Sequence, residues 1–156
     1  MTIRISHTKT TGFTLIELLA ALAIVGVTTA TALPAYQDYM STAATTKVSH
    51  AYDMAVATAQ REFSKNTSRM ALGLTSTLPL NNAGWIKIFD AESRATSGDG
   101  GPAYRPGHQP GDESTPSGAV HVKFHSDHLC ITRNSFYDLI ALKNRVYNDA
   151  VKVEEL

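Results

Sequence analysis

An apolar run from Phe13 to Leu33, interrupted by the single charge of Glu17, is the first long feature of the hydrophobic pattern. A helix rises ~1.5 Å per residue, so this run covers roughly 30 Å, the thickness of the hydrocarbon core of a bilayer. A cleavable secretory signal would end in a small-residue site after its apolar stretch. Here the run continues without a loop into residues 34–40, "PAYQDYM". The pattern therefore predicts the first half of one long helix.

Beyond Pro34 the apolar residues recur every three or four positions among polar ones, which is typical of an amphipathic helix. We expect this helix to end near residues 64–67, and before Gly73. The downstream chain should cover its apolar stripe. The stripe consists of Met40, Ala44, Val48, Ala51 or Tyr52, Ala55, Ala59 and Phe63.

The rest of the chain alternates between irregular and strand-like segments. Residues 68–84 read as an irregular connection, and residues 85–89, "WIKIF", have the β-branched and aromatic content of a strand. Residues 93–118 contain six glycines and four prolines, which predicts a long surface loop.

The last third begins with strict alternation over residues 120–125, which predicts a half-buried strand with His121, Lys123 and His125 facing water. A turn at residues 126–127 would let residues 129–132 pair back as a hairpin. Residues 135–148 begin like a capping box and continue at helical spacing, so we expect a helix there. A final strand is the alternative. The predicted fold class is α+β: a long N-terminal helix, membrane-spanning in its first half and amphipathic in its second, packed on a small antiparallel β-sheet.

Composition adds few constraints. The 156 residues carry 14 basic and 14 acidic side chains, so no net charge points to a nucleic acid or an acidic polymer as partner. Only Arg4 and Lys9 are charged before Glu17. The lone cysteine, Cys130, excludes an intramolecular disulfide and is predicted to be a small buried side chain within a strand.

Glu17 is the anomaly of the apolar run. An acidic side chain near the start of a membrane helix costs about 2–3 kcal/mol, which makes it a candidate functional residue. A positive partner from outside the helix, such as the free α-amino group of another copy of the chain, would offset this cost. The alternative is that the side chain merely extends to the lipid headgroups.

The basic leader, Gly12 and the following "FTLIELLAALAIVG" resemble the signature of type IV pilins and pseudopilins. This resemblance implies that a prepilin peptidase, an inner-membrane aspartic enzyme, cuts after Gly12 and methylates the new amine of Phe13. Glu17, the fifth residue after the cut, would then neutralise the Phe13 amine of a neighbouring subunit. The implied segments are a leader (1–12), a membrane and filament-core half-helix (13–33), an amphipathic half-helix (34–66) and a globular head (67–156) that includes the loop 93–118.

Gly26 and Pro34 are weak points of the predicted helix, because proline removes a backbone hydrogen bond and glycine costs about 1 kcal/mol relative to alanine. In the family, the stretch between such residues can lose its helical structure when it packs into the filament. A gentle kink in an otherwise intact helix is the alternative.

The sequence contains two groups of candidate metal ligands. His121, His125 and His128 are potential ligands, but His121 and His125 would lie about 13 Å apart on an extended strand, too far to share an ion. Asp99, Asp112 and Glu113 in the loop offer oxygen ligands that suit Ca²⁺, and major pseudopilins hold calcium in a comparable region. Their spacing is irregular, and a solvated loop is the alternative. Apart from calcium at these residues, no cofactor is expected.

The sequence contains no glycine-rich phosphate-binding motif at a strand–helix junction and no distinctive catalytic constellation, so we expect no enzymatic activity. The resemblance implies a type IV pilus subunit, held in the bacterial inner membrane as a single-pass precursor and then assembled on an inner-membrane platform, with other pilins, into an extracellular filament. One alternative is a pseudopilin of a type II secretion system, which assembles within the periplasm. Another is a minor pilin that binds DNA or a surface, if its basic residues converge: Arg94, Arg105, Lys123, Arg133, Lys143 and Arg145.

Overall fold

The computed structural model describes residues 12–107, 117–126, 128–147 and 151–155, which form two compact units divided after Tyr39. The described residues form two helices and five strands. They are α1 (Leu15–Ala71), α2 (Asn82–Phe89), β1 (Tyr104–Pro106), β2 (Val120–Phe124), β3 (His128–Arg133), β4 (Leu142–Tyr147) and β5 (Val151–Glu155).

Helix α1 is continuous and ends at Ala71, slightly later than expected. Gly73 adopts φ +75°, the left-handed conformation that glycine accepts without strain. Its N–H donates to the Met70 carbonyl (3.0 Å), and the Leu74 N–H donates to the Arg69 carbonyl (3.0 Å). This pair of bonds is a Schellman motif, which satisfies two of the last carbonyls and stops the helix.

The core of the second unit lies between α1 and the sheet. The stripe predicted on the helix is confirmed from Val48 to Phe63, where Ala55 and Ala59 are completely buried. Both side chains belong to the core cluster that the sheet completes. From the other side the core receives Trp85, Val120, Val122, Leu129, Ile131 and Val146.

The segment 85–89 was predicted to be a strand, and this is wrong, because it forms α2. Asn81 caps the helix, its side-chain oxygen accepting from the Gly84 N–H at 2.7 Å. Helical spacing places Trp85 and Phe89 on one face, and the Trp85 ring packs between Phe63 (5.4 Å between centroids) and Phe124 (6.4 Å). Tertiary packing thus overrides the β-propensity of the segment.

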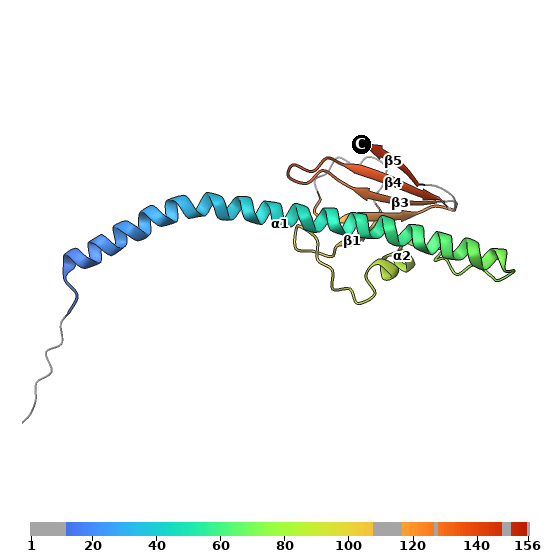
Figure 1. Ribbon diagram of the computed structural model, residues 1–156, viewed down its shortest axis with the longest axis horizontal. Helices are drawn as coiled ribbons and strands as arrows, with labels where there is room; N and C mark the ends of the chain where they lie inside the picture. Colours follow the sequence, from blue (N-terminus) through green and yellow to red (C-terminus); the bar gives the residue numbers. More distant parts are fainter. Residues whose placement is uncertain (1–11, 108–116, 127, 148–150, 156) are drawn as a thin grey trace, which may run out of the picture. The chain divides into compact units, whose positions relative to one another are not determined.

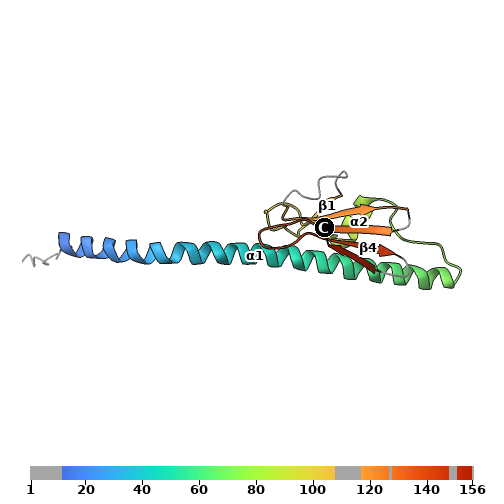
Figure 2. The same ribbon diagram turned by 90° about the horizontal axis from the view of Figure 1, so that it is seen from above.

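The five strands form one sheet in the order β1-β2-β3-β4-β5. Figure 1 shows β3, β4 and β5 side by side, and Figure 2 shows from above the same sheet lying along the second half of α1. The predicted hairpin is confirmed, with Lys123 opposite Cys130 and Phe124 opposite Leu129, although Asp127 lies outside the described residues. The sheet is mixed rather than wholly antiparallel, since β1 joins β2 in parallel.

The helix predicted over residues 135–148 is also wrong, and the alternative, a strand, is what forms. Phe136 and Leu139 exchange two backbone hydrogen bonds around Tyr137, whose φ is +50°, so the capping-box pattern marks a tight turn. Strand β4 follows and pairs with β3 along its whole length. Asn144 and Val146, two positions apart on β4, are buried. The prediction of a helix missed this period of two.

Two surface predictions also need correction. His121 was expected to face water but is only 3% exposed, since its ring packs against the loop 93–118, where the Ser117 hydroxyl lies 3.2 Å from its Nε2. The described part of the loop 93–118 is not wholly irregular, because it contains β1 and a bridge between Thr96 and Pro102. Gly98 is required there, since a Cβ would lie 2.6 Å from the Phe136 ring.

Arg133 joins the sheet to the helix within the second unit. Its guanidinium lies 5.3 Å from the centre of the Tyr52 ring and donates to the Ser49 hydroxyl and the Ile140 carbonyl, each at 3.1 Å. Burial raises the pKa of Tyr52 to about 12, although the Arg133 charge acts in the opposite direction. The Tyr52 hydroxyl has no hydrogen-bond partner among the described residues.

Phe63→Ala should destabilise the second unit by about 3–5 kcal/mol, because the variant leaves a cavity against the Trp85 ring. The measurement is denaturant unfolding of the full chain in detergent, followed by the fluorescence of Trp85, the only tryptophan. Met54→Ala, on the exposed side of the same helix, is the matched control and should change stability by no more than about 0.5 kcal/mol. Equal effects of the two variants would contradict this core.

The stability of the unit should fall as the pH rises from 10.0, the ordinary pKa of tyrosine, through about 12, the pKa of folded Tyr52. The sign follows because the unfolded chain ionises first and therefore binds fewer protons over this range. Tyr52→Phe should match the wild type at neutral pH and lose less stability over the same alkaline range. Parallel pH profiles of the two proteins would show that the Tyr52 ring is not buried as described.

Candidate functional site

The candidate site is the first unit, where every described residue, from Gly12 to Tyr39, is exposed to solvent. Helix α1 is long and apolar enough in this part to cross a membrane, judged by length and composition. Leu, Ile and Val side chains are exposed all round this half of the helix, as the values for Leu15, Ile16, Leu18, Leu19, Leu22, Ile24, Val25 and Val27 show. An apolar surface of this size requires lipid or other apolar helices around it.

Glu17 lies in the first turn of α1 and belongs to a capping box. The Thr14 N–H and hydroxyl donate to Oε2 of Glu17 at 2.9 and 2.7 Å, and the Glu17 N–H donates back to the Thr14 hydroxyl at 3.3 Å. This arrangement holds the carboxylate beside the N-terminal end of the helix, next to Phe13. Both Thr14 contacts use Oε2, which leaves Oε1 to accept from a further donor.

Gly12 and Phe13 precede the helix, and the Phe13 side chain is 88% exposed. A Cβ added at Gly12 would meet nothing within 4 Å, so the packing of this chain does not require glycine there. That a processing enzyme requires a small residue at Gly12 stays a prediction. The leader before Gly12 lies outside the described residues.

Gly26 and Pro34 lie inside the uninterrupted helix α1. A Cβ at Gly26 would also be unopposed. Between the two residues, the hydroxyls of Thr28, Thr29 and Thr31 donate to carbonyls three or four positions earlier at 2.7–3.0 Å. The hydroxyls are therefore satisfied within the helix. Loss of helical structure in a filament stays a prediction.

Asp99 is the one calcium candidate that the structure describes, since Asp112 and Glu113 lie outside the described residues. Its carboxylate accepts from the Ser97 hydroxyl, from the Gly101 N–H at 3.1 Å and from Arg105 at 3.1 Å. The Ser97 bond is the main reason why the pKa of Asp99 is lowered, with burial opposing it and Arg105 adding to it. An ion at Asp99 would compete with Arg105, and calcium binding there stays a prediction.

The basic residues converge only in part. Lys123, Lys143 and Arg145 surround the Cys130 thiol on one face of the sheet. The other three are engaged elsewhere: Arg94 pairs with Glu92, Arg105 with Asp99, and Arg133 contacts the helix.

The three histidines separate in a way that sequence reasoning missed. His121 lies apart beside Ser117, whereas the His125 and His128 rings stack at 4.7 Å between centroids. Ligand atoms of His125, His128 and Cys130 lie within 4.8 Å of one another. The register of the hairpin, with residue 123 opposite 130, is what adds Cys130 to this group.

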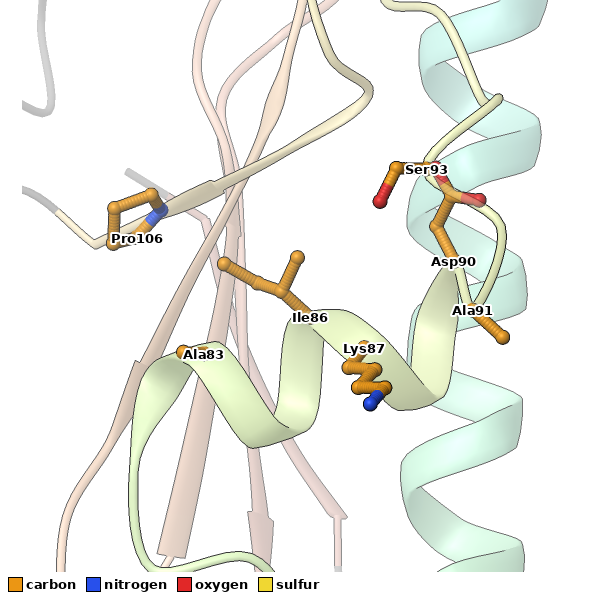
Figure 3. A pocket seen from close by; sticks show the side chains of 7 residues that line it. All are labelled: Ala83, Ile86, Lys87, Asp90, Ala91, Ser93 and Pro106. Carbon is orange, nitrogen blue, oxygen red and sulfur yellow. The ribbon is translucent and has the colours of Figure 1, made fainter.

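A pocket of about 370 Å³ lies between α2 and β1. Figure 3 shows Ile86 reaching from the helix toward Pro106, with Asp90 and Ser93 at the C-terminal end of the helix. The Asp90 carboxylate accepts from the backbone N–H groups of Arg94 and Ala95, at 3.1 and 2.9 Å, so it is part of the turn after α2. Nothing among the pocket's lining residues points to a particular ligand.

The chain was compared with known proteins. Residues 8–33 match the family described as the prokaryotic N-terminal methylation motif. The chain is 63% identical over 38 residues to the type IV major alpha-pilin of Moraxella bovis, a match that covers 24% of each protein. It is 60% identical over 37 residues to the type IV major pilin protein PilE1 of Neisseria gonorrhoeae, covering 24% of this chain and 22% of that protein. No solved structure was found to match.

The chain thus spans about a quarter of the length of the curated relatives it matches, and each of these matches covers less than a third of the chain. The α+β fold, with a long apolar N-terminal helix followed by a small sheet, agrees with the pilin fold expected from the sequence. The N-terminal segment of the chain is therefore similar to the N-terminal segments of type IV pilins.

Proposed function

We propose that the chain is a structural subunit of a type IV pilus, inserted in the inner membrane as a precursor and then polymerised through the first half of α1. The observation that carries the proposal is an apolar half-helix that is exposed over its whole surface and has one carboxylate in its first turn. The pilin-like N-terminal sequence supports the same role. Lipid would cover the half-helix before assembly, and the half-helices of other subunits would cover it afterwards.

In this proposal, a prepilin peptidase removes residues 1–12 and methylates the amine of Phe13. Glu17 then pairs with the Phe13 amine of a neighbouring subunit as the inner-membrane platform adds subunits. The capping box supports the second step, because it already holds the carboxylate at the end of the helix where such an amine would arrive. In an apolar filament core, an unpaired charge is costly, so the pair would fix the register between subunits.

Two alternatives use the same N-terminal segment. A pseudopilin of a type II secretion system would polymerise in the periplasm instead of outside the cell. A minor pilin that binds DNA is favoured by one observation, the gathering of Lys123, Lys143 and Arg145 on one sheet face. Phosphate contacts by these residues would make that binding fall steeply with salt. No catalytic step is proposed for either alternative.

Glu17→Ala should leave cleavage after Gly12 intact but lower the amount of the chain in sheared surface filaments by at least about tenfold. The missing charge pair is worth about 2–3 kcal/mol, and 1.4 kcal/mol already corresponds to tenfold. The measurement is quantitative mass spectrometry of filaments and membranes. Asp53→Ala, which removes a carboxylate from an exposed site on the same helix, is the control.

Glu17→Gln separates the charge from the cap, because glutamine can still accept from Thr14 in a capping box. We expect the glutamine variant to be as poor in assembly as the alanine variant. Normal filament levels with glutamine would assign Glu17 to helix capping and overturn the charge pair.

Gly12→Val should block processing without disturbing the fold, since among the described residues beyond its neighbours no atom lies within 4 Å of the position where a Cβ would be added. Wild-type filaments should contain a chain that begins with N-methylated Phe13, whereas the variant should stay in the membrane at its precursor mass. Gly26→Ala, at an equally open position in the helix, should be processed normally. A Gly12→Val chain that still begins at Phe13 would refute the assigned cleavage site. A processed wild-type chain found in membranes but absent from surface filaments would favour the pseudopilin.

A further inference from the structure

The β2–β3 hairpin brings three metal-binding side chains to one place. The backbone N–H of His125 donates to the backbone carbonyl of His128 at 2.9 Å, which closes the turn. Lys123 lies opposite Cys130 where the two strands pair. Side chains alternate along a strand, so His125, His128 and Cys130 lie on one face of the sheet. Leu129 and Ile131, on the other face, belong to the core.

The geometry of this cluster is compact. Its ligand atoms lie within 4.8 Å of one another, and the two imidazole rings are nearly parallel, with an angle of 8° between their planes. The Tyr147 ring, on β4, flanks His128 at 5.0 Å. Cys130 is 5% exposed, whereas both histidines are half-buried, so an ion would reach the thiol from the end of the hairpin, past the imidazoles.

We propose that His125, His128 and Cys130 bind one thiophilic transition-metal ion, for which Zn²⁺ is the reference. Two imidazole nitrogens and one thiolate are ligands that zinc prefers, and water would complete a tetrahedral site. Ligands bound to zinc at 2.0–2.3 Å stand about 3.4–3.8 Å apart, so small side-chain rotations close the site. The cluster offers no carboxylate, which disfavours Ca²⁺ and Mg²⁺.

The surrounding charges affect this site in two ways. Burial raises the pKa of the Cys130 thiol, while Lys143, Arg145 and Lys123 act to lower it. These cations help to form a thiolate but repel a metal ion, so binding depends on the sulfur–metal bond. The reaction replaces the thiol proton by Zn²⁺ and releases that proton to solvent.

This site is independent of filament assembly, because it lies in the second unit and uses none of the residues of the N-terminal segment. A bound ion would join the two strands at the end where the hairpin turns. Since it would bind the folded chain and not the unfolded one, it would raise the midpoint of thermal unfolding.

The test uses the full chain without a histidine tag, purified in detergent and stripped of metal with a chelator. Co²⁺, which reports its ligands by absorption, should bind once per chain with a sulfur-to-cobalt charge-transfer band in the near ultraviolet, and Zn²⁺ should displace it. Cys130→Ala should abolish that band and weaken Zn²⁺ binding at least about 100-fold. His125→Ala and His128→Ala should each weaken it at least about tenfold, since even partners beyond the direct ligands contribute 10–100-fold.

His50→Ala is the control, because His50 is exposed on α1 and should not affect binding. Trp85 fluorescence checks that each variant is folded. If Cys130→Ala does not fold, X-ray absorption of the zinc-loaded wild type decides, with one sulfur expected at about 2.3 Å and nitrogen at about 2.0–2.1 Å. A spectrum without sulfur, a wild-type affinity in a folded Cys130→Ala chain, or no binding at all would overturn the proposal.

Discussion

Burial of apolar helix surface is the interaction on which both units depend, and α1 meets this requirement in two different ways. In the second unit, a narrow stripe from Val48 to Phe63 is covered by the chain's own sheet and by Trp85. In the first unit, the apolar surface is exposed all round, and no described residue of that unit covers it. Because water is a poor solvent for such a surface, its cover has to come from lipid or from other chains. The head can therefore be complete in one molecule, whereas the N-terminal half-helix cannot.

Glu17 adds a directional interaction to the non-directional burial of apolar surface. Apolar helices attract one another in many registers, because hydrophobic burial is non-directional. A carboxylate in an apolar surrounding favours the arrangement that brings a positive group to it, and its bonds with Thr14 restrict where that group has to stand. In the proposed filament, the same residue that makes the helix costly to insert as a monomer would select one arrangement of subunits.

Sequence patterns predicted those parts of the fold whose environment is periodic. The stripe on α1 and the β2–β3 hairpin were predicted because one face of each is buried at a regular spacing. Residues 85–89 and 135–148 failed for the opposite reason. In the first, Asn81 and the aromatic cluster around Trp85 outweigh β-propensity, and in the second, a turn around Tyr137 imitates a helix start. The grouping of His125, His128 and Cys130 depends on strand register, which spacing within one segment does not reveal.

The extent of similarity to known pilins follows from the difference between the N-terminal half-helix and the head. Identity to the two relatives described above extends over 38 and 37 residues in the N-terminal region. Within a filament core, each position of the half-helix would contact other copies. Because every subunit carries the same sequence, a substitution there would change the contacts of all subunits at once. The head has a weaker constraint: it needs only to cover a stripe in which Ala55 and Ala59 are small. Many sheets with a suitable apolar face satisfy that condition, so new features such as the cluster of His125, His128 and Cys130 can arise in the head without altering the N-terminal half-helix.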